Sequence, residues 1–439
     1  MNKILFFLVL LATLFLASCS NQKNVWVEGW QSVEPLNIPR AGAATVVVNN
    51  AIYVIGGIDG KNFLESVEYT HITEDGLIDP WKYTQSLPDA IGFTAAVAHQ
   101  GFIYVAGGGN GNHGKNLLNR VIRAKVMTDG QLGPWVEQTA MSLPRRCAKL
   151  LIHENSLYTF GGFGGTLLDT VEKSDFGQDN SLSSWTLETN KLITPRYVNS
   201  LQKVGSVAYL MGGHHPERGE GLRSVEFAHL NSKQLTWKKS SPMLTPRYGL
   251  SSATLGEYIF ALGGISGTEY LTTTEVSNVT SNGEIAAWKM NTELPFAMAN
   301  FSTIVHNDKI ILIGGVMPEG YLRNISLAEI DARGRFGFWA TPEQAHVYKT
   351  NKTAQLKSRQ ELPNQGKILE IIQTEQYSYI RLEINQQETW LAGPVTMLAV
   401  GDEIEFSKGV TMSNFYSKSL AKNFQKIVFV GELVRKKQH

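Results

Sequence analysis

Ile52-Tyr-Val-Ile-Gly-Gly57 is an apolar run, typical of a β-strand, that ends in a pair of glycines, and Trp81 follows 25 residues after the first of them. The same pattern returns five more times along the 439 residues, with first glycines spaced 51, 54, 51, 51 and 51 residues apart. A period near 50 residues predicts a repeat architecture. The six pairs begin at Gly56, Gly107, Gly161, Gly212, Gly263 and Gly314, and the tryptophans that follow them are Trp81, Trp135, Trp185, Trp237, Trp288 and Trp339.

Each repeat predicts four short strands separated by turns. In the first repeat an apolar segment follows Arg40, and it is followed by the strand that ends at Gly57, by the segment 66–69 and by a strand that holds Trp81. Paired glycines permit close backbone approach, and one tryptophan per unit supplies a large apolar area between successive sheets. Residues 39–340 therefore resemble the kelch repeat, and the resemblance implies an all-β chain built around a closed six-bladed kelch-type β-propeller.

One tryptophan is left over from this count. Trp30 precedes Trp81 by 51 residues, but no glycine pair comes before it. The strand edges of a propeller need protection, and the last blade is commonly sealed by a strand from the other terminus. The segments around Trp30 and Trp339 both fit this role, and the pattern does not choose between them.

The first 18 residues have the pattern of an export signal, in which a lysine is followed by an apolar run too short to span a membrane. The run ends in Leu-Ala-Ser before Cys19, which resembles a bacterial lipobox. This resemblance implies that Cys19 is lipidated, for example with palmitate, and becomes the mature N-terminus, and the serine after it implies the outer membrane. An ordinary signal peptide that contains a cysteine is the alternative. We expect a lipid-anchored protein of the bacterial cell envelope, with residues 19–38 as its lipidated N-terminus and possible closing strand.

The composition is that of a globular protein without a strong electric field. There are 40 Lys and Arg residues against 39 Asp and Glu residues, so we expect no nucleic-acid partner. Cys147 is the only cysteine besides Cys19. The mature chain therefore depends on packing rather than on a disulfide, and we expect Cys147 to be a small buried hydrophobic residue.

A second domain is predicted after the propeller. Residues 341–362 are polar and predict a linker or an irregular crossing segment, and strand signals resume in residues 363–439 at 367–372, 377–384, 388–391, 402–406 and 427–430. Five short strands suit a small β-barrel. The phrases Trp390-Leu-Ala-Gly-Pro394 and Met412-Ser-Asn-Phe-Tyr-Ser-Lys-Ser-Leu420 resemble the NrfJ-type exported family. That resemblance implies an OB-like domain linked to envelope redox proteins.

Within this domain the stretch 412–420 is polar and lacks strand alternation, so it predicts a contact loop. Its outward side chains would be Asn414, Tyr416 and Lys418, with Met412 and Phe415 holding it to the barrel. The aromatic residues Tyr377, Tyr379, Trp390 and Phe415 fit either a stacking surface or the core and rim of the barrel, and the core interpretation is favoured because large aromatic residues dominate small cores.

Four arginines occur at equivalent positions, 16 residues before the first glycine of a pair: Arg40, Arg145, Arg196 and Arg247, with Ile91 and Met298 in the other two repeats. If they lined the channel of a propeller they would favour an anionic ligand such as an acidic sugar. The third strands carry Glu68, Ile122, Glu172, Glu226, Glu275 and Glu329 at roughly matching positions. The repeat that lacks Glu also lacks Arg, which favours buried structural pairs, because a buried charge that loses its partner is costly.

Two loops depart from the repeat on one face of the expected propeller, and such loops commonly form the binding surface. The candidate binding residues in them are Asn110, Asn112, His113, His214, His215, Glu217 and Arg218. Histidine and carboxylate side chains suit zinc or copper, but no recognised ligand spacing occurs in the chain, and we expect neither a metal nor another cofactor.

The sequence contains no nucleophile elbow, phosphate-binding glycine loop or haem attachment motif, so it predicts no catalytic residue. The favoured interpretation is a non-enzymatic scaffold that binds an envelope protein or a small anionic or carbohydrate ligand through its propeller face and its C-terminal domain. The alternative is a carbohydrate enzyme facing the periplasm, since exported sialate mutarotases resemble this architecture. Unpaired Glu and Arg side chains at the channel mouth would favour the enzyme, and intact Arg-Glu pairs would favour the scaffold.

Overall fold

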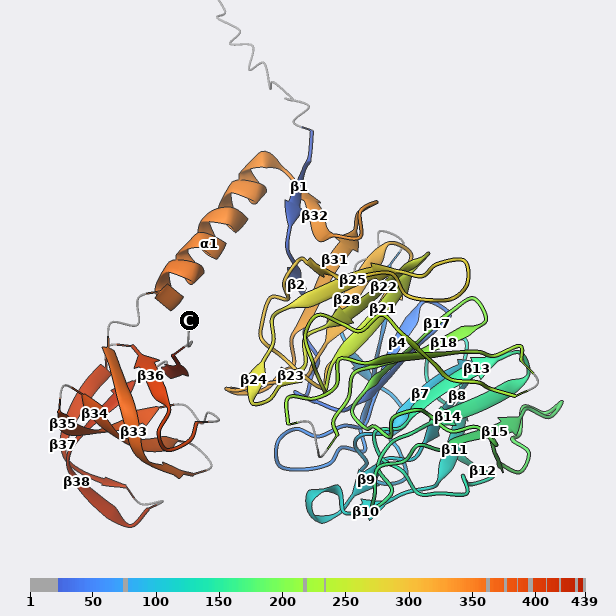
Figure 1. The fold of residues 1–439 in the computed structure, drawn as a ribbon, viewed down its shortest axis with the longest axis horizontal. Coiled ribbons are helices and arrows are strands. Elements are labelled where there is room, and N and C mark those ends of the chain that lie inside the picture. Colours follow the sequence, from blue (N-terminus) through green and yellow to red (C-terminus); the bar gives the residue numbers. More distant parts are fainter. Residues whose placement is uncertain are drawn as a thin grey trace, which may run out of the picture.

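The structure is a computed structural model, and it describes residues 23–73, 78–215, 219–232, 234–360, 364–374, 377–384, 386–393, 398–407, 409–417, 420–430 and 433–436. Its main body is a ring of six antiparallel sheets (Figure 1), which confirms the predicted six-bladed propeller. No helix in this part of the chain has the length and the hydrophobicity that crossing a membrane requires.

Each of the first three blades has four strands in sequence order. The first blade contains β3 (Ala44–Val48), β4 (Ala51–Ile55), β5 (Val67–His71) and β6 (Lys82–Tyr83). The second contains β7 (Ala95–His99), β8 (Phe102–Ala106), β11 (Val121–Lys125) and β12 (Val136–Gln138). The third contains β13 (Lys149–His153), β14 (Ser156–Phe160), β15 (Val171–Asp175) and β16 (Thr186–Leu187).

The remaining blades repeat this plan. The fourth contains β17 (Ser200–Val204), β18 (Val207–Met211), β19 (Val225–His229) and β20 (Lys238–Ser240), and the fifth contains β21 (Ser251–Leu255), β22 (Tyr258–Leu262), β25 (Thr274–Asn278) and β26 (Lys289–Asn291). The sixth contains β27 (Ser302–His306), β28 (Lys309–Ile313), β31 (Ile325–Ile330) and β32 (Phe336–Ala340). The inner strand β27 contacts the inner strand β3, so the ring is closed.

Short strands and one 3-10 helix lie on one face of the ring, in the connections that follow the glycine pairs. They are β9 (Gly109–Asn110), the 3-10 helix η1 (Asn112–Gly114), β10 (Asn116–Leu117), β23 (Ile265–Ser266), β24 (Glu269–Tyr270), β29 (Val316–Met317) and β30 (Gly320–Tyr321). We call this side the loop face. The glycine pairs are required here: Gly56 has φ 61°, and a Cβ atom on it would lie 2.4 Å from the carbonyl oxygen of Ile91.

Both candidate segments take part in closing the sixth blade. Strand β2 (Gln31–Val33) pairs with one half of β31, β32 pairs with the other half, and β1 (Val25–Glu28) adds to the outside of β32. Trp30 is 5% exposed and donates its Nε1 hydrogen to the carbonyl oxygen of Glu293 at 2.8 Å. Trp81, Trp185 and Trp288 make the same kind of bond to the preceding blade. Trp30 is therefore the tryptophan of the sixth blade, whereas Trp339 is 55% exposed.

The core of the propeller is divided among the interfaces between blades. Six hydrophobic clusters each combine residues of two neighbouring blades, for example Tyr53 with Val105 between the first and second blades. Tyrosine hydroxyls link blades at the opposite face, where Tyr53 donates to the carbonyl oxygen of Gly130 and Tyr209 to that of Gly283, each at 2.8 Å. Cys147 is buried as expected, and burial raises the pKa of its thiol to about 11.

The polar segment after the propeller contains a helix, α1 (Pro342–Gln360), so the alternative of an irregular crossing segment is wrong, while the linker stays a prediction. A capping box starts the helix: the Gln344 side chain accepts a hydrogen bond from the Thr341 backbone at 3.0 Å, and the Thr341 hydroxyl accepts one from the Gln344 backbone at 3.3 Å. Proline at the first helical position fits this start, because its missing N–H would have no partner there. In Figure 1, α1 leads from the propeller to a separate sheet.

That C-terminal sheet has seven strands in the order β37-β38-β35-β34-β33-β36-β39. All neighbours are antiparallel except β35 and β38, which are parallel. The strands are β33 (Asn364–Gln373), β34 (Ser378–Ile384), β35 (Gln387–Gly393), β36 (Glu403–Phe406), β37 (Gly409–Ser417), β38 (Lys422–Val430) and β39 (Leu433–Arg435). The five predicted strands lie within or close to β33, β34, β35, β36 and β38.

Candidate functional site

The four arginines are internal parts of their blades. Each pairs with the glutamate of the same blade, Arg40 with Glu68 at 2.5 Å and Arg247 with Glu275 at 2.6 Å, and every one of these side chains is 0% exposed. The other two pairs are Arg145 with Glu172 and Arg196 with Glu226, which are equally buried. Burial lowers the pKa of all four guanidinium groups, and the paired carboxylates oppose this shift.

Each pair also ties the backbone of its blade together. In the fifth blade Arg247 donates to the carbonyl oxygens of Gly263 and Thr273 at 2.8 and 3.0 Å, and Glu275 accepts from the backbone N–H groups of Leu244 and Thr245. The arginine thus fixes the glycine pair, and the glutamate fixes the loop before the arginine. The Glu275 carboxylate and the Nη1 and Nη2 atoms of Arg247 are used inside the blade, and the Arg247 Nε atom is buried, so none of these groups is available to a ligand in the channel.

The equivalent of these glutamates in the sixth blade is Ser326, not Glu329. Glu275 lies opposite Ala261, two residues before the glycine pair, and the residue opposite Leu312 at that position of the sixth blade is Ser326. Glu329 instead lies opposite Lys309. With this correction, four blades have both charges and two have neither, as structural pairing requires.

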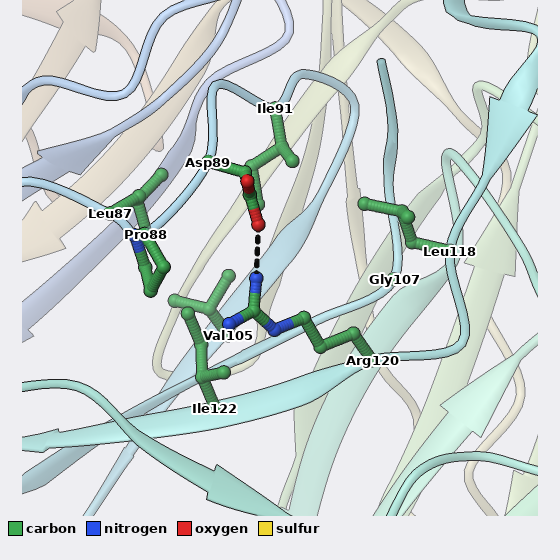
Figure 2. A pocket seen from close by; sticks show the side chains of 9 residues that line it. All are labelled: Leu87, Pro88, Asp89, Ile91, Val105, Gly107, Leu118, Arg120 and Ile122. Carbon is green, nitrogen blue, oxygen red and sulfur yellow. Dashed lines mark hydrogen bonds and ion pairs between the residues drawn. The ribbon is translucent and has the colours of Figure 1, made fainter. Parts of the chain in front are cut away.

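The second blade shows what replaces the pair. Ile91 and Ile122 occupy the two positions, and a cavity of about 10 Å³ remains beside them (Figure 2). Arg120, at the position that is serine or threonine in the four paired blades, forms a partly exposed ion pair with Asp89 at 2.5 Å and another with Glu137. The charges of this blade therefore lie nearer the surface, and its interior is apolar.

A ring of left-handed residues surrounds the axis at the loop face, where the inner strands begin. Its members are Gly42, Phe93, Cys147, Val198, Gly249 and Asn300, with φ between 45° and 62°. Backbone hydrogen bonds of 2.8 Å join neighbours in this ring, from Phe93 to Gly42, from Cys147 to Phe93, from Gly249 to Val198, from Asn300 to Gly249 and from Gly42 to Asn300. The residue that precedes each member of the ring forms an antiparallel bridge with the loop that follows the glycine pair of the same blade. The ring therefore fixes the positions of these six residues on the loop face.

Three of the residues fixed in this way carry large side chains: Arg146, Tyr197 and Tyr248 directly follow the buried arginines of the third, fourth and fifth blades. The equivalent residues in the other blades are Ala41, Gly92 and Ala299. The loop face is therefore asymmetric, with its bulky side chains on three consecutive blades. Sequence reasoning missed them, although the position after each blade arginine could have revealed them.

An arc of rings runs over these blades. The guanidinium carbon of Arg146 lies 5.1 Å from the ring centre of Phe163, and ring centres are 5.7 Å apart from Phe163 to Tyr197, 5.3 Å from Tyr197 to His214 and 5.2 Å from His214 to Tyr248. We call Phe163, Tyr197, His214 and Tyr248 the aromatic arc. A groove of about 490 Å³ lies along it, lined by Phe163, Gly165, Thr166, Leu167, Pro195, Tyr197, His214 and His215.

The His214 imidazole and the Tyr197 and Tyr248 hydroxyls of the aromatic arc all favour their neutral forms. Burial lowers the pKa of His214 and the neighbouring His215 lowers it further, while burial raises the pKa of Tyr197 and Tyr248. The Nδ1 atom of His214 is buried without a hydrogen-bond partner in the described chain. The site can therefore offer flat apolar rings, one imidazole nitrogen and the nearby Arg146 charge to a ligand.

The predicted loop of the second blade, which contains Asn110, Asn112 and His113, lies beside the same site, next to Arg146. Arg146 donates to the carbonyl oxygens of His113 and Gly114 at 3.1 and 3.2 Å, and Asn110 lies in β9, where its side chain accepts from Asn116 at 2.6 Å. Asn112 begins η1. The structure thus brings the two predicted loops to one face, with the backbone of His113, rather than its imidazole, holding Arg146.

Glu217, Arg218, Lys418 and Cys19 lie outside the described residues. Within the described ranges, no group of three or more His, Cys, Asp or Glu side chains could hold a metal ion.

The predicted contact loop at 412–420 is wrong as a loop, because residues up to Ser417 form the edge strand β37. Asn414 has a left-handed φ of 53° and is exposed, and Tyr416 is 54% exposed. Met412 is 44% exposed and does not hold the strand to the core. Among the aromatic residues, Tyr379 stacks on Phe424 in the core, whereas Tyr377 is exposed at the rim.

Comparisons with known proteins agree with the fold. Residues 39–69 match the Kelch motif. Kelch repeat and BTB domain-containing protein 1 of Cowpox virus is 28% identical over 171 residues, covering 38% of this chain and 28% of that protein. Beta-scruin of Limulus polyphemus is 24% identical over 211 residues, covering 47% and 22%. The chain thus spans about a quarter of the length of these curated relatives.

A solved structure extends the likeness across the propeller. The structure of YjhT superimposes with a TM-score of 0.58 at 14% identity, and the match covers 70% of this chain and 99% of that one. This likeness concerns the fold. The kelch-type six-bladed propeller is therefore supported by the blades, by the motif and by a solved structure.

Proposed function

We propose that this chain is an exported, lipid-anchored binding protein whose loop face holds a ligand with a flat apolar side, such as a saccharide. The observation that carries the proposal is the groove beside the aromatic arc. Its volume of about 490 Å³ is in the range of small-molecule sites, which are mostly apolar with a few placed polar groups. A sugar ring presents C–H groups to an aromatic ring and hydroxyls to polar neighbours, and this groove supplies both kinds of partner.

Binding rather than catalysis is supported by where the charges lie. The four arginines that occupy equivalent positions in their blades each form an ion pair with a buried glutamate and donate hydrogen bonds to backbone carbonyl groups. This is the arrangement that favours the scaffold over the carbohydrate enzyme. The His214 imidazole lines the groove and the Arg146 guanidinium lies beside it against Phe163, a set suited to donating and accepting hydrogen bonds.

A glycan array probed with the purified full chain tests this proposal. We expect saccharides to bind the wild type and to bind about 5- to 150-fold more weakly to Tyr197→Ala and Phe163→Ala, since stacking on an aromatic ring contributes about 1–3 kcal/mol in recognition of other flat ligands. Tyr83→Ala is the matched control, because Tyr83 is 51% exposed on β6, outside the groove. No binding to any glycan, or equal binding by all variants, would refute the saccharide site.

The anchor is a separate part of the proposal. Cys19 follows the apolar run of the signal, and its acylation would place the propeller at a membrane surface. Labelling of cells with a palmitate analogue should mark the wild-type chain, and Cys19→Ala should abolish both the label and the maturation. Release of normally processed, unlabelled protein would contradict the lipid anchor.

The C-terminal sheet is proposed as an OB-like module that docks a protein partner of the envelope. The order β33-β34-β35-β38-β37, with β35 and β38 parallel, supports this assignment, since it is the strand order of that barrel class. The exposed edge strand β37 presents Asn414 and Tyr416 to solvent. Pull-down from envelope extracts with the full chain and with Tyr416→Glu tests the contact, and an unchanged set of partners would move the contact elsewhere.

A further inference from the structure

A pair of tryptophans, of which Trp339 is exposed and Trp26 is half-buried, lies at the junction between the propeller and α1. Trp339 on β32 lies directly opposite Trp26 on β1, with ring centres 5.5 Å apart and planes at 71°. Trp339 is 55% exposed, whereas each of the repeat tryptophans in the core is largely buried. Trp339 therefore takes no part in blade packing, and together with the half-buried Trp26 and the exposed Val25 it forms an apolar surface at this junction.

The two rings occupy the face of the ribbon that α1 leaves free. Val27 and Phe338 on the other face pack against Ala345 and Tyr348 of the helix. Because side chains alternate along a strand, Trp26 and Trp339 point away from the helix. Gly337 makes room for this arrangement, since a Cβ atom on it would lie 2.5 Å from the ring of Trp26. Trp26 therefore lies across the ribbon and supports the exposed ring of Trp339.

This ribbon is tethered closely to the proposed lipid. Val25, the first residue of β1, is six residues after Cys19. Six residues of fully extended chain span at most about 20 Å. Val25 is itself 39% exposed, and Lys23 in the tether is exposed as well. Acylation of Cys19 would thus hold a largely apolar strand pair, with Lys23 just before it, within a short distance of the membrane surface.

We propose that the β1–β32 ribbon, through Trp26 and Trp339, rests in the headgroup region of the membrane that carries the lipid of Cys19. An exposed tryptophan such as Trp339 favours this region because its ring is apolar while its N–H group can bond to water or headgroups, and the half-buried Trp26 contributes apolar surface beside it. Lys23 adds attraction to anionic lipids. Two contacts, an acyl anchor and an interfacial ribbon, bind more stably than one and fix the orientation of the propeller on the surface.

The inference rests on the proposed lipid anchor, and its test separates the two. The lipidated full chain is reconstituted into vesicles of phosphatidylethanolamine and phosphatidylglycerol that carry bromine near the headgroup end of the acyl chains, and tryptophan fluorescence is recorded. We expect the wild type to be quenched and Trp339→Phe to lose most of this quenching. Trp390→Phe, which removes a half-buried tryptophan from the C-terminal sheet, should keep the quenching of the wild type.

Each contrary result has its own meaning. Equal quenching of the wild type and of Trp339→Phe overturns the ribbon contact, and loss of quenching in Trp390→Phe instead assigns the membrane contact to the C-terminal sheet. Dimers in sedimentation that disappear in Trp339→Phe would show that a second copy covers the ring, which also overturns the proposal. If palmitate labelling fails, the anchor is wrong, and quenching after addition of the chain to the same vesicles still decides the ribbon contact. A thermal melt confirms that each variant is folded.

Discussion

The Nη2 atom of Arg247 lies 2.6 Å from the Oε1 atom of Glu275 inside the fifth blade, and neither side chain is exposed to solvent. Removing one partner leaves the other charged and buried, which typically costs about 3–5 kcal/mol. We therefore expect Arg247→Ile or Glu275→Ile alone to destabilise the chain by about that amount, and the double substitution to cost less than either single one. Denaturant unfolding of the three variants checks this, and additive losses would contradict a structural pair.

The second blade supplies a natural precedent for that double variant. It holds Ile91 and Ile122 at the two positions and still forms all its strands. Its cavity of about 10 Å³ is close to the smallest space that holds one water molecule. The isoleucine pair in the fifth blade should likewise fit without a large void.

Substitutions of Trp30 and of Trp339, the two tryptophans associated with the sixth blade, should differ sharply in their effect on the free energy of unfolding. Trp30→Ala removes a buried ring that packs on Phe336 and bonds to Glu293, so we expect a loss of about 3–5 kcal/mol. Trp339→Ala should change the free energy of unfolding by no more than about 0.5 kcal/mol, because the ring is largely exposed. Trp237→Ala, in the fourth blade, should behave like Trp30→Ala. A large loss for Trp339→Ala would mean that Trp339, not Trp30, is the tryptophan of the sixth blade.

The tyrosine links between blades predict sensitivity to alkali. Burial raises the pKa of Tyr209 to about 12, from an ordinary value near 10, and its hydroxyl donates to the carbonyl oxygen of Gly283. A raised pKa means that the stabilisation is complete below about pH 10 and is lost as the pH rises toward 12. The stability difference between the wild type and Tyr209→Phe should therefore shrink over this interval in denaturant melts. A difference that stays constant from pH 9 to pH 12 would contradict the role of this hydroxyl.

The ring of left-handed residues predicts opposite effects on stability for two exchanges between valine and glycine. Val198 is a β-branched residue with φ 45°, a conformation that costs about 1–2 kcal/mol, whereas Gly249 holds the equivalent place in the next blade. Val198→Gly should be tolerated or slightly stabilising. Gly249→Val should be clearly destabilising, because a Cβ atom there would also lie 3.1 Å from the Asn300 side chain. Thermal melts of both variants test the ring, and the opposite order of stability would refute it.

The repeat itself could be predicted because its signals are local. Glycine pairs and tryptophans mark positions where the backbone or the packing admits few residues, so their phase predicted six blades. Equivalence between strands was less certain: Glu329 matched by distance along the chain, whereas hydrogen-bond register assigns the position to Ser326. The helix α1 was missed because its residues are polar, although the Thr341-Pro342-Glu343-Gln344 start is a recognisable capping box.

The candidate site was only partly predictable for a related reason. The histidine loops stand out by composition, and His214 does lie in the groove. Tyr197 and Phe163 come from different blades, and only the closed ring brings them to one face. The edge strand β37 was taken for a loop because the adjacent polar residues Ser413 and Asn414 and the adjacent aromatic residues Phe415 and Tyr416 break the polar–apolar alternation that marks a half-buried strand.

In the sheet of the sixth blade, strands from the beginning of the chain pair with strands from the end of the propeller, and this pairing sets when the propeller can close. Strands β1 and β2 belong to the beginning of the chain, and their partners β31 and β32 are synthesised more than 290 residues later. Until residue 340 has been made, the last blade lacks its outer strands and the first strands lack a partner, so closure must wait for nearly the whole propeller. The earliest segment to be synthesised is thus the last to be paired, and any chaperone that binds unpaired strand edges would act on this chain before its ring closes.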